Sequence, residues 1–168
     1  NRPELFFKAL KSVIKQQFNN YEIIIIDDGS TEQNKIQYQD IVSNYNNQHI
    51  KLIHLIFRPN GHNSSFTRNY GVELSSGRYV CFLDDDDIWT DKNHLNNAYQ
   101  SIINKTETVD LYLTNQNAIK QDGTYENNVW IEDLQEKVLN TLLIDKTGTY
   151  LLNTQKLLLS NGFCHLNC

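Results

Sequence analysis

Apolar residues recur along the chain with two periods, and these predict alternating helices and strands. Residues 3–17 place apolar side chains at the 3.6-residue helical period, and Pro3 suits the first turn of a helix. Residues 21–26 include four consecutive isoleucines, a run typical of a strand that is buried on both faces of a parallel sheet. Further helices are expected over 32–45, 65–75 and 91–104, and further strands over 51–57, 78–83 and 109–114.

This order of elements predicts an α/β fold with a mostly parallel sheet flanked by helices. A doubly wound unit normally begins with a strand, whereas this chain begins with a helix, so we expect an inner strand before Asn1. The pattern weakens beyond residue 115. There we expect a hairpin with its turn at Asp122-Gly123, helices near 132–143 and 154–161, and a short strand at 148–152.

Composition and charge narrow the class of protein. The 168 residues carry 15 Lys plus Arg against 20 Asp plus Glu, a formal net charge of −5. Nucleic-acid binding is not expected, because neutralising phosphates requires clustered basic residues. The chain contains no methionine and no secretory signal. Its three cysteines lack metal or CxxC spacing and are typical of reduced thiols, which indicates a cytoplasmic location.

Acidic residues follow two of the expected strands directly. Asp27 and Asp28 come after the isoleucine run, and four aspartates at 84–87 come after the strand at 78–83. In a parallel sheet the carboxyl ends of the strands share one edge, where ligands bind, so both groups should lie together. Packing carboxylates is unfavourable, and a bound divalent cation such as Mg²⁺ or Mn²⁺ would turn the repulsion into attraction. The alternative is a solvated acidic turn, or a carboxylate at a helix start.

Smaller signals accompany these acidic groups. The sequence Gly29-Ser30-Thr31 predicts a turn followed by a helix cap, and Gly77 predicts the end of the helix at 65–75. Arg68 lies on that same helix, where it would contact a base or a diphosphate, although a surface arginine is the simpler interpretation. The five histidines show no metal spacing and are interpreted as surface or core residues. Dinucleotide, P-loop and nucleophile-elbow motifs are absent from the sequence.

Taken together, these segments resemble the family 2 glycosyltransferases of the GT-A fold. The resemblance rests on KSVIKQQFNNYEIIIIDDGS at 11–30, on NGHNSSFTRNYGVELSSGRYVCFLDDDDIW at 60–89, and on the spacing between them. It covers roughly residues 1–115, which would be the nucleotide-sugar-binding part. Residues 116–168 would begin the acceptor-side part of the same domain, and KLLLSNGFCHL near the end resembles the Gly-Phe segment of the family.

The resemblance implies a role for each matching residue. Asp28 would bind the uracil or an equivalent base, Asp27 would support the turn within the nucleotide-binding group, and Arg68 would lie against the base. Asp84, Asp85 and Asp86 would form the metal and nucleotide motif. Within it, Asp86 would ligate the metal directly, with Asp84 as a further candidate ligand, and either Asp84 or Asp85 would contact the ribose. The family's metal is Mn²⁺ or Mg²⁺, and its donors are usually UDP-sugars.

The implied reaction is transfer of the sugar to an acceptor hydroxyl with inversion, in the synthesis of a surface polysaccharide or glycoconjugate. The acceptor would be a saccharide or a lipid-linked saccharide, and in the latter case the protein would associate peripherally with the inner face of the membrane. The proline usual shortly after the aspartate motif is replaced near Thr90-Asp91.

The catalytic base of the family lies in an acidic motif after the Gly-Phe segment, and residues 162–166 contain no carboxylate. We therefore assign no base, and His165 is more plausibly a terminal surface residue. A non-catalytic nucleotide-sugar-binding or partner-binding module of the same fold is the main alternative. A nucleotidyltransferase is a further one, but it usually requires a Gly-rich loop with a basic residue, which the sequence lacks.

Overall fold

A computed structural model of the chain describes residues 1–45, 49–104, 112, 114, 117–120, 123–129 and 163–166. The chain forms two compact units, one of Asn1–Ile103 with Leu158–Cys168 and one of Asn104–Leu157. The described part of the second unit is a hairpin of β4 (Asn117–Ile119) and β5 (Tyr125–Val129), which pair antiparallel. Gly123 turns between them with a φ of 82°, so the hairpin predicted at Asp122-Gly123 is confirmed.

The first unit is built on a four-stranded sheet with the strand order β2-β1-β6-β3. Its strands are β1 (Tyr21–Asp27), β2 (Ile50–His54), β3 (Tyr79–Cys81) and β6 (Phe163–Leu166). β1 pairs parallel with β2, and β6 runs antiparallel to both of its neighbours, β1 and β3. Three of the four strands therefore point the same way, as the mostly parallel prediction requires.

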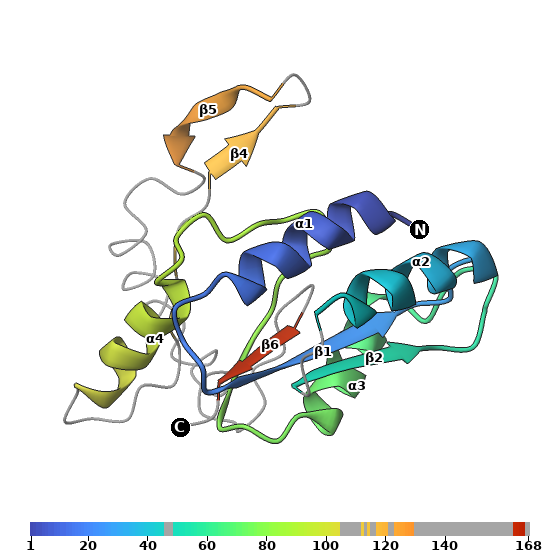
Figure 1. Cartoon of the computed structure of the whole chain (residues 1–168), viewed down its shortest axis with the longest axis horizontal. Coiled ribbons are helices and arrows are strands. Elements are labelled where there is room, and N and C mark those ends of the chain that lie inside the picture. The colour runs from blue at the N-terminus through green and yellow to red at the C-terminus, as the bar shows by residue number, and fades with distance from the viewer. Residues whose placement is uncertain are drawn as a thin grey trace, which may run out of the picture. The chain divides into compact units, whose positions relative to one another are not determined.

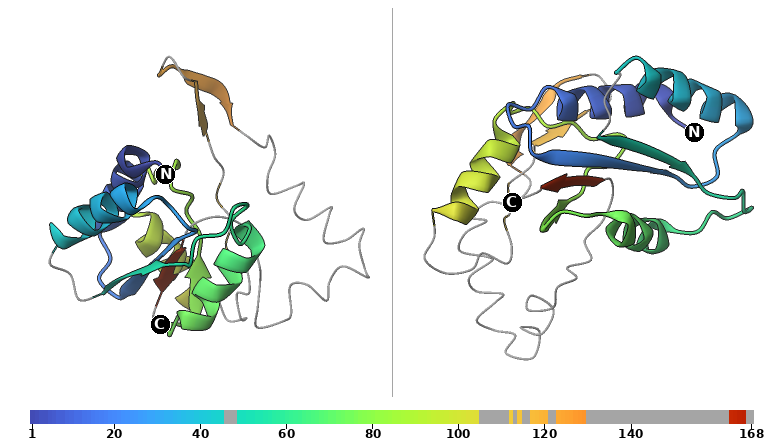
Figure 2. Two further views of the ribbon diagram at one scale, coloured as in Figure 1. Left: turned by 90° about the vertical axis from the view of Figure 1, so that its right-hand side faces the viewer. Right: turned by 60° about the horizontal axis from the view of Figure 1, so that its bottom comes forward.

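Helices cover both faces of this sheet, so the predicted α/β layering is confirmed. α1 (Pro3–Ile14) and α2 (Glu32–Ser43) lie on one face and α3 (Ser64–Leu74) on the other (Figures 1 and 2). α4 (His94–Ile103) follows the loop after β3. In α1 the buried side chains are spaced three or four residues apart and form one stripe toward the sheet (Phe6, Ala9, Leu10 and Val13).

The core of the first unit lies between α1, α2 and β1. Ile23 and Ile24 are 2% and 1% exposed, as expected for a strand with both faces covered. The ring of Phe6 packs edge-on against that of Tyr38 from α2, with 5.1 Å between the ring centres. β1 is therefore more deeply buried than β2 and β3, and it fixes the position of the turn that follows it.

Most predicted elements are confirmed, with boundaries that differ by a few residues. Thr31 caps α2 by accepting the backbone N–H of Asn34, so the helix cap predicted at Gly29-Ser30-Thr31 is confirmed. Gly77 does not end α3, because the helix stops at Leu74 and Ser75 is already extended. The Ser75 hydroxyl donates to the carbonyl of Val72 instead, so a side chain satisfies the helix end where a left-handed glycine was predicted.

Other predictions concern positions that the structure does not test. The expected helices near 132–143 and 154–161 and the strand at 148–152 lie outside the described residues, as does most of the strand at 109–114. The inner position between β1 and β3 is taken by β6. A strand before Asn1 lies outside this sequence and stays a prediction.

Two polar side chains, one in α1 and one just after it, fix the segment that follows the four aspartates. Gln16 is buried, donates to the carbonyl of Asp91 and accepts the backbone N–H of Leu95 at the start of α4. The hydroxyl of Ser12 accepts the backbone N–H of Trp89. Because buried amides and hydroxyls must be hydrogen-bonded, these contacts hold the loop between β3 and α4 against α1.

Glu22 connects three segments from the start of β1. Its carboxylate accepts hydrogen bonds from Lys51 of β2 at 2.9 Å and from the backbone and hydroxyl of Ser76 at 2.7 and 2.6 Å. Burial alone would raise the pKa of Glu22, but these hydrogen bonds outweigh it and lower the pKa to about 2. The ionised form is therefore favoured in the folded protein.

Replacing Glu22 with Gln should reduce stability in a way that depends on pH. Its pKa lies at about 2 in the folded protein against an ordinary value of 4.5, so the stabilisation is full above pH 4.5 and is lost as the pH falls toward 2. At pH 7 we expect the free energy of unfolding to fall by roughly 1 to 3 kcal/mol, measured by urea unfolding. The exposed Glu73→Gln is the control. A Glu22→Gln deficit that is unchanged between pH 6 and pH 3 would contradict the assignment.

Candidate functional site

The two acidic groups lie level with one another at one edge of the sheet. β6 connects β1 and β3 in a common register, with Leu166 between Tyr21 and Tyr79 and Cys164 between Ile23 and Cys81. Four residues beyond Ile23 is Asp27, and the same step beyond Cys81 reaches the aspartates at 84–87. The carboxyl ends of β1 and β3 therefore bring both groups to the same edge, as predicted from the sequence.

Asp27 faces the sheet and stabilises the turn after β1. One carboxylate oxygen accepts the backbone N–H of Ser30 at 3.2 Å, and the other lies 2.9 Å from Nδ1 of His54, its register partner on β2. Only 6% of the side chain is exposed. Asp27 thus has the supporting contacts that the family resemblance implied, and these contacts occupy both of its oxygens.

Asp28 faces the opposite way, into the loop between β2 and α3. The backbone N–H of His62 donates to both carboxylate oxygens at 2.9 Å, and Nδ1 of His62 lies 2.6 Å from Oδ1. Gly61 has a φ of 65°, and a Cβ at this position would stand 2.7 Å from Oδ2 of Asp28. The loop therefore closes tightly around this carboxylate, and only a glycine allows that approach.

Arg68 and Asp84 are oppositely charged residues, and each has one buried side-chain atom without a hydrogen-bond partner in the described part of the chain. Among the described residues, Nε of Arg68 and Oδ1 of Asp84 are buried polar side-chain atoms without a hydrogen-bond partner. Burial, followed by the neighbouring negative charge of Asp87, raises the pKa of Asp84 to about 6 even though Arg68 opposes the rise. Burial also lowers the pKa of Arg68. Unpaired buried atoms are costly, so both groups are suited to a ligand that would satisfy them.

Arg2 binds two further aspartates of the cluster, Asp85 and Asp86. Its guanidinium donates from Nε to Asp85 at 3.1 Å and from Nη1 to Asp86 at 2.5 Å, and Nη2 makes a further bond to Asp85. The Arg2 side chain is 50% exposed, and those of Asp85 and Asp86 are 39% and 44% exposed. Exposed ion pairs are weak, so this arginine partly neutralises the cluster without sealing it.

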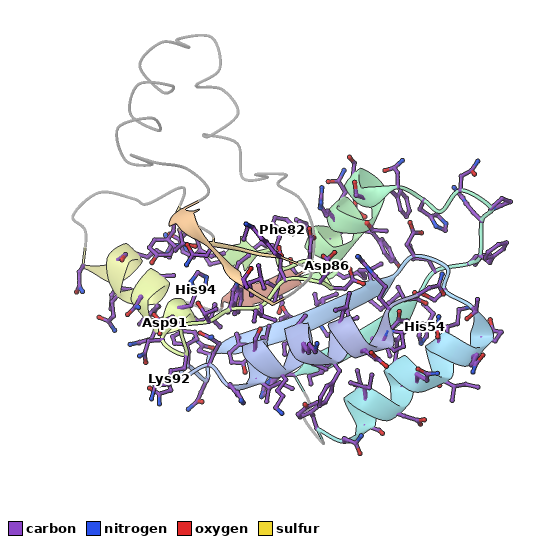
Figure 3. The ribbon with its side chains drawn as sticks, turned by 90° about the horizontal axis from the view of Figure 1, so that it is seen from above. His54, Phe82, Asp86, Asp91, Lys92 and His94 are labelled. Carbon is purple, nitrogen blue, oxygen red and sulfur yellow. The ribbon has the colours of Figure 1, made fainter. Side chains whose placement is uncertain are left out.

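These residues line one cavity of about 450 Å³ in the first unit. Its polar part is formed by Asp28, Arg68 and Asp84 to Asp86, with Arg2 beside them, and its inner part runs along α1 and β1 over apolar side chains. In the view of Figure 3, Asp86 is seen between α1 and α3, well apart from Asp91 and His94 at the start of α4. Every site residue predicted from the sequence lines this cavity, including Asp27 at its wall.

The aspartates fit a cation only in part. Within the described residues, no three His, Cys, Asp or Glu side chains converge closely enough to enclose a metal ion. Mg²⁺ typically uses only one or two protein carboxylates and completes its shell with water and phosphate oxygens. Asp84, whose buried Oδ1 has no hydrogen-bond partner among the described residues, and Asp86, which is 44% exposed and paired with Arg2, are the two carboxylates available for such a role.

Sequence comparison identifies the family. A model described as "Glycosyl transferase family 2" matches residues 1–159. The chain belongs to this family. The α/β fold and the family resemblance predicted from the sequence are thereby confirmed, and the cavity at the carboxyl edge of the sheet is the candidate site of a family 2 glycosyltransferase.

Several family 2 relatives have names that describe their activities. The chain is 35% identical over 89 residues to "Amylovoran biosynthesis glycosyltransferase AmsB" of Erwinia amylovora, covering 53% of this chain and 29% of that protein. It is 37% identical over 93 residues to "GalNAc(5)-diNAcBac-PP-undecaprenol beta-1,3-glucosyltransferase" of Campylobacter jejuni, covering 52% and 27%. It is 25% identical over 162 residues to "Glycosyltransferase GlyG" of Streptococcus pneumoniae, covering 95% and 51%. The chain therefore spans about a third to a half of the length of these relatives.

None of the described helices has the length and apolar character needed to cross a bilayer.

Sequence reasoning missed two residues of this site. Arg2 is separated from Asp85 by 83 positions, and no local pattern indicates that pairing. His62 was interpreted as a surface or core residue because it has no metal spacing. Its position directly after Pro59-Asn60-Gly61 was the available signal, since such a turn brings the next backbone N–H toward a neighbouring strand end.

Replacing Asp84 with Asn should stabilise the folded protein at neutral pH. The pKa of this carboxyl is raised from 3.8 to about 6, so its ionised form destabilises the folded protein. The destabilisation is complete above pH 6 and absent below pH 3.8. We expect a gain on the order of 2 kcal/mol at pH 7.5 that disappears by pH 3.5, measured by urea unfolding at each pH. A variant less stable than the parent at pH 7.5 would contradict this account of the cluster.

Replacing Gly61 with Ala should cost more than the same change at Gly123. Both glycines have positive φ, but a Cβ at Gly61 meets Asp28 at 2.7 Å, whereas a Cβ at Gly123 meets nothing within 4 Å. Gly123→Ala should cost about 1 kcal/mol from backbone strain alone. Gly61→Ala should cost roughly 1 to 2 kcal/mol more, because Asp28 must turn away from His62. Equal losses in thermal unfolding would show that the loop does not close on Asp28.

Proposed function

We propose that this chain transfers a sugar from a nucleoside-diphosphate sugar, with UDP as the nucleotide, to an acceptor hydroxyl with inversion. The observation that carries the proposal is the meeting of Asp28, Arg68 and the aspartates at 84–86 in one cavity, where opposite charges retain unsatisfied atoms. A nucleotide with a diphosphate carries a base with hydrogen-bond donors at one end and negative charge at the other. The cavity offers a complementary group for each.

Asp28 is the group suited to the base. An ionised carboxylate only accepts hydrogen bonds, and the ring N–H of uracil is a donor. Arg68 is suited to the diphosphate or the base, because its fork of N–H donors fits anionic oxygens and its plane can stack on a ring. Arg68 lines the same cavity as Asp28, and its buried Nε has no hydrogen-bond partner among the described residues.

Asp84 and Asp86 are the residues proposed to hold Mn²⁺ or Mg²⁺, with Asp85 available to the ribose. When bound, such a cation offsets the negative charge that develops on the departing nucleoside diphosphate. The aspartates supply hard oxygen ligands, and because the pKa of Asp84 is raised to about 6, cation binding should weaken as the pH falls below 6 and that carboxyl becomes protonated.

Transfer with inversion also needs one base that removes the proton of the acceptor hydroxyl. No described residue is assigned to that role. We propose a saccharide or lipid-linked saccharide as the acceptor, in the synthesis of a surface polysaccharide or glycoconjugate. The names of two relatives support this, since one refers to amylovoran biosynthesis and the other to an undecaprenol-linked saccharide. A lipid-linked acceptor would bring the protein to the cytoplasmic face of the membrane.

UDP together with Mn²⁺ should raise the melting temperature of the full chain, and Asp86→Ala should abolish that rise. Stabilisation by a ligand follows mass action and amounts to about 2.7 kcal/mol at a hundredfold excess over Kd. The control variant is Asp40→Ala on the exposed side of α2, which should keep the full shift.

The donor class is tested by comparing UDP, GDP and dTDP, each with and without Mn²⁺. A shift that is equally large with UDP alone would exclude metal dependence. If none of the three nucleotides stabilises the parent protein more than the Asp86→Ala variant, the assignment of the site is wrong.

A further inference from the structure

We propose that His62 is a positioning residue that fixes the carboxylate of Asp28 in the orientation needed to distinguish a uracil from a cytosine. This inference rests on the proposed function, because it concerns how the same cavity selects its nucleotide. It assigns a role to a residue that has no metal spacing and that the proposed mechanism does not otherwise use.

The contacts of Asp28 leave it little freedom. A carboxylate offers about four acceptor positions on its two oxygens. The backbone N–H of His62 lies 2.9 Å from both oxygens, and Nδ1 of the same residue lies 2.6 Å from Oδ1. His62 therefore makes two contacts to Oδ1 and one contact to Oδ2. One acceptor position of Asp28 remains, on Oδ2, and its direction is fixed by the other three contacts. The side chain of Asp28 is 29% exposed, so part of the carboxylate remains accessible.

His62 is itself held in place by the helix that carries Arg68. Only 6% of its side chain is exposed, and its ring stacks on that of Phe66 at 5.2 Å with an angle of 25° between the planes. Phe66 stacks in turn on Tyr70, one helical turn further along α3, at 6.1 Å and 16°. Asn63 caps the helix by accepting the backbone N–H of Phe66. The orientation of Asp28 is therefore set by the rigid start of α3 as well as by β1.

A fixed acceptor distinguishes two pyrimidines that differ at one ring nitrogen. N3 of uracil carries a hydrogen and donates, whereas N3 of cytosine has a lone pair and would face the carboxylate without a hydrogen between them. A site built around one buried hydrogen bond rejects a ligand that cannot make it more strongly than an apolar pocket would. This rejection requires that Asp28 cannot rotate to another partner, and His62 provides that constraint.

The experiment measures binding of UDP and of CDP to the full chain in the presence of Mn²⁺, by titration calorimetry. His62→Phe keeps a ring that can stack on Phe66 but removes the side-chain donor. His62→Asn places an amide N–H near the position of Nδ1 but removes the stacked ring. His49→Phe makes the same chemical change at an exposed position before β2 and is the matched control.

We expect the parent protein and the His49→Phe control to bind UDP at least tenfold more tightly than CDP. His62→Phe should weaken UDP binding about tenfold and bring the two affinities within threefold of each other, while His62→Asn should keep most of the preference. Melting temperatures check that each variant is folded, and His62→Leu replaces His62→Phe should the latter not fold.

The outcomes separate the two proposals. A parent protein that binds neither nucleotide, or binds both equally, overturns the proposed donor and with it this inference. A parent that prefers UDP, together with a folded His62→Phe that keeps the same preference, overturns the role of His62 alone. A folded His62→Asn that loses the preference as fully as His62→Phe also overturns it, because the side-chain hydrogen bond would then not be the cause.

Discussion

The accumulation of carboxylates at one edge of the sheet is the constraint around which the first unit is organised. Two like charges about 4 Å apart repel by roughly 1 kcal/mol in water and by roughly 4 kcal/mol at an effective dielectric of 20. Burial, and after it the repulsion from the neighbouring aspartates, raises the pKa of Asp84. Each of the other aspartates that line the cavity contacts a positive charge or a hydrogen-bond donor from a different segment. These contacts constrain the positions of Arg2, His54 and His62.

The pleat of a single strand gives the two adjacent aspartates different tasks. Consecutive side chains of a strand point to opposite faces, so Asp27 and Asp28 cannot share surroundings. Asp27 is buried against His54 and the backbone of Ser30, and it stabilises the turn. Asp28 is directed into the loop before α3 and keeps part of its surface open to the cavity. The Asp-Asp pair thereby combines a structural carboxylate and a ligand-facing one within two residues.

The sequence was sufficient to predict whatever depends on local pattern. The run of isoleucines in β1, the Thr31 cap of α2 and the aspartates after two strands follow from periodicity and from residues close in the chain. The end of α3 was placed too late, because a serine hydroxyl served where a glycine was expected. The pairing of Arg2 with Asp85, 83 positions away, could not be predicted, because it depends on how the strands are ordered in the sheet. The turn before His62 is visible in the sequence, but its partner Asp28, 34 positions away, is not indicated by any local pattern.

The two ends of the site also differ in how firmly they are held. Asp28 is bound by a nearly buried histidine that stacks on α3, so changing its orientation would break several coupled contacts. Asp85 and Asp86 are bound by a half-exposed arginine, and an exposed ion pair contributes at most about 1 kcal/mol. A cation that approaches the aspartates has only that weak interaction to displace. The end proposed to bind the base is therefore preorganised. At the end proposed to face the diphosphate, one positive charge can be exchanged for another without disturbing β1 or α3.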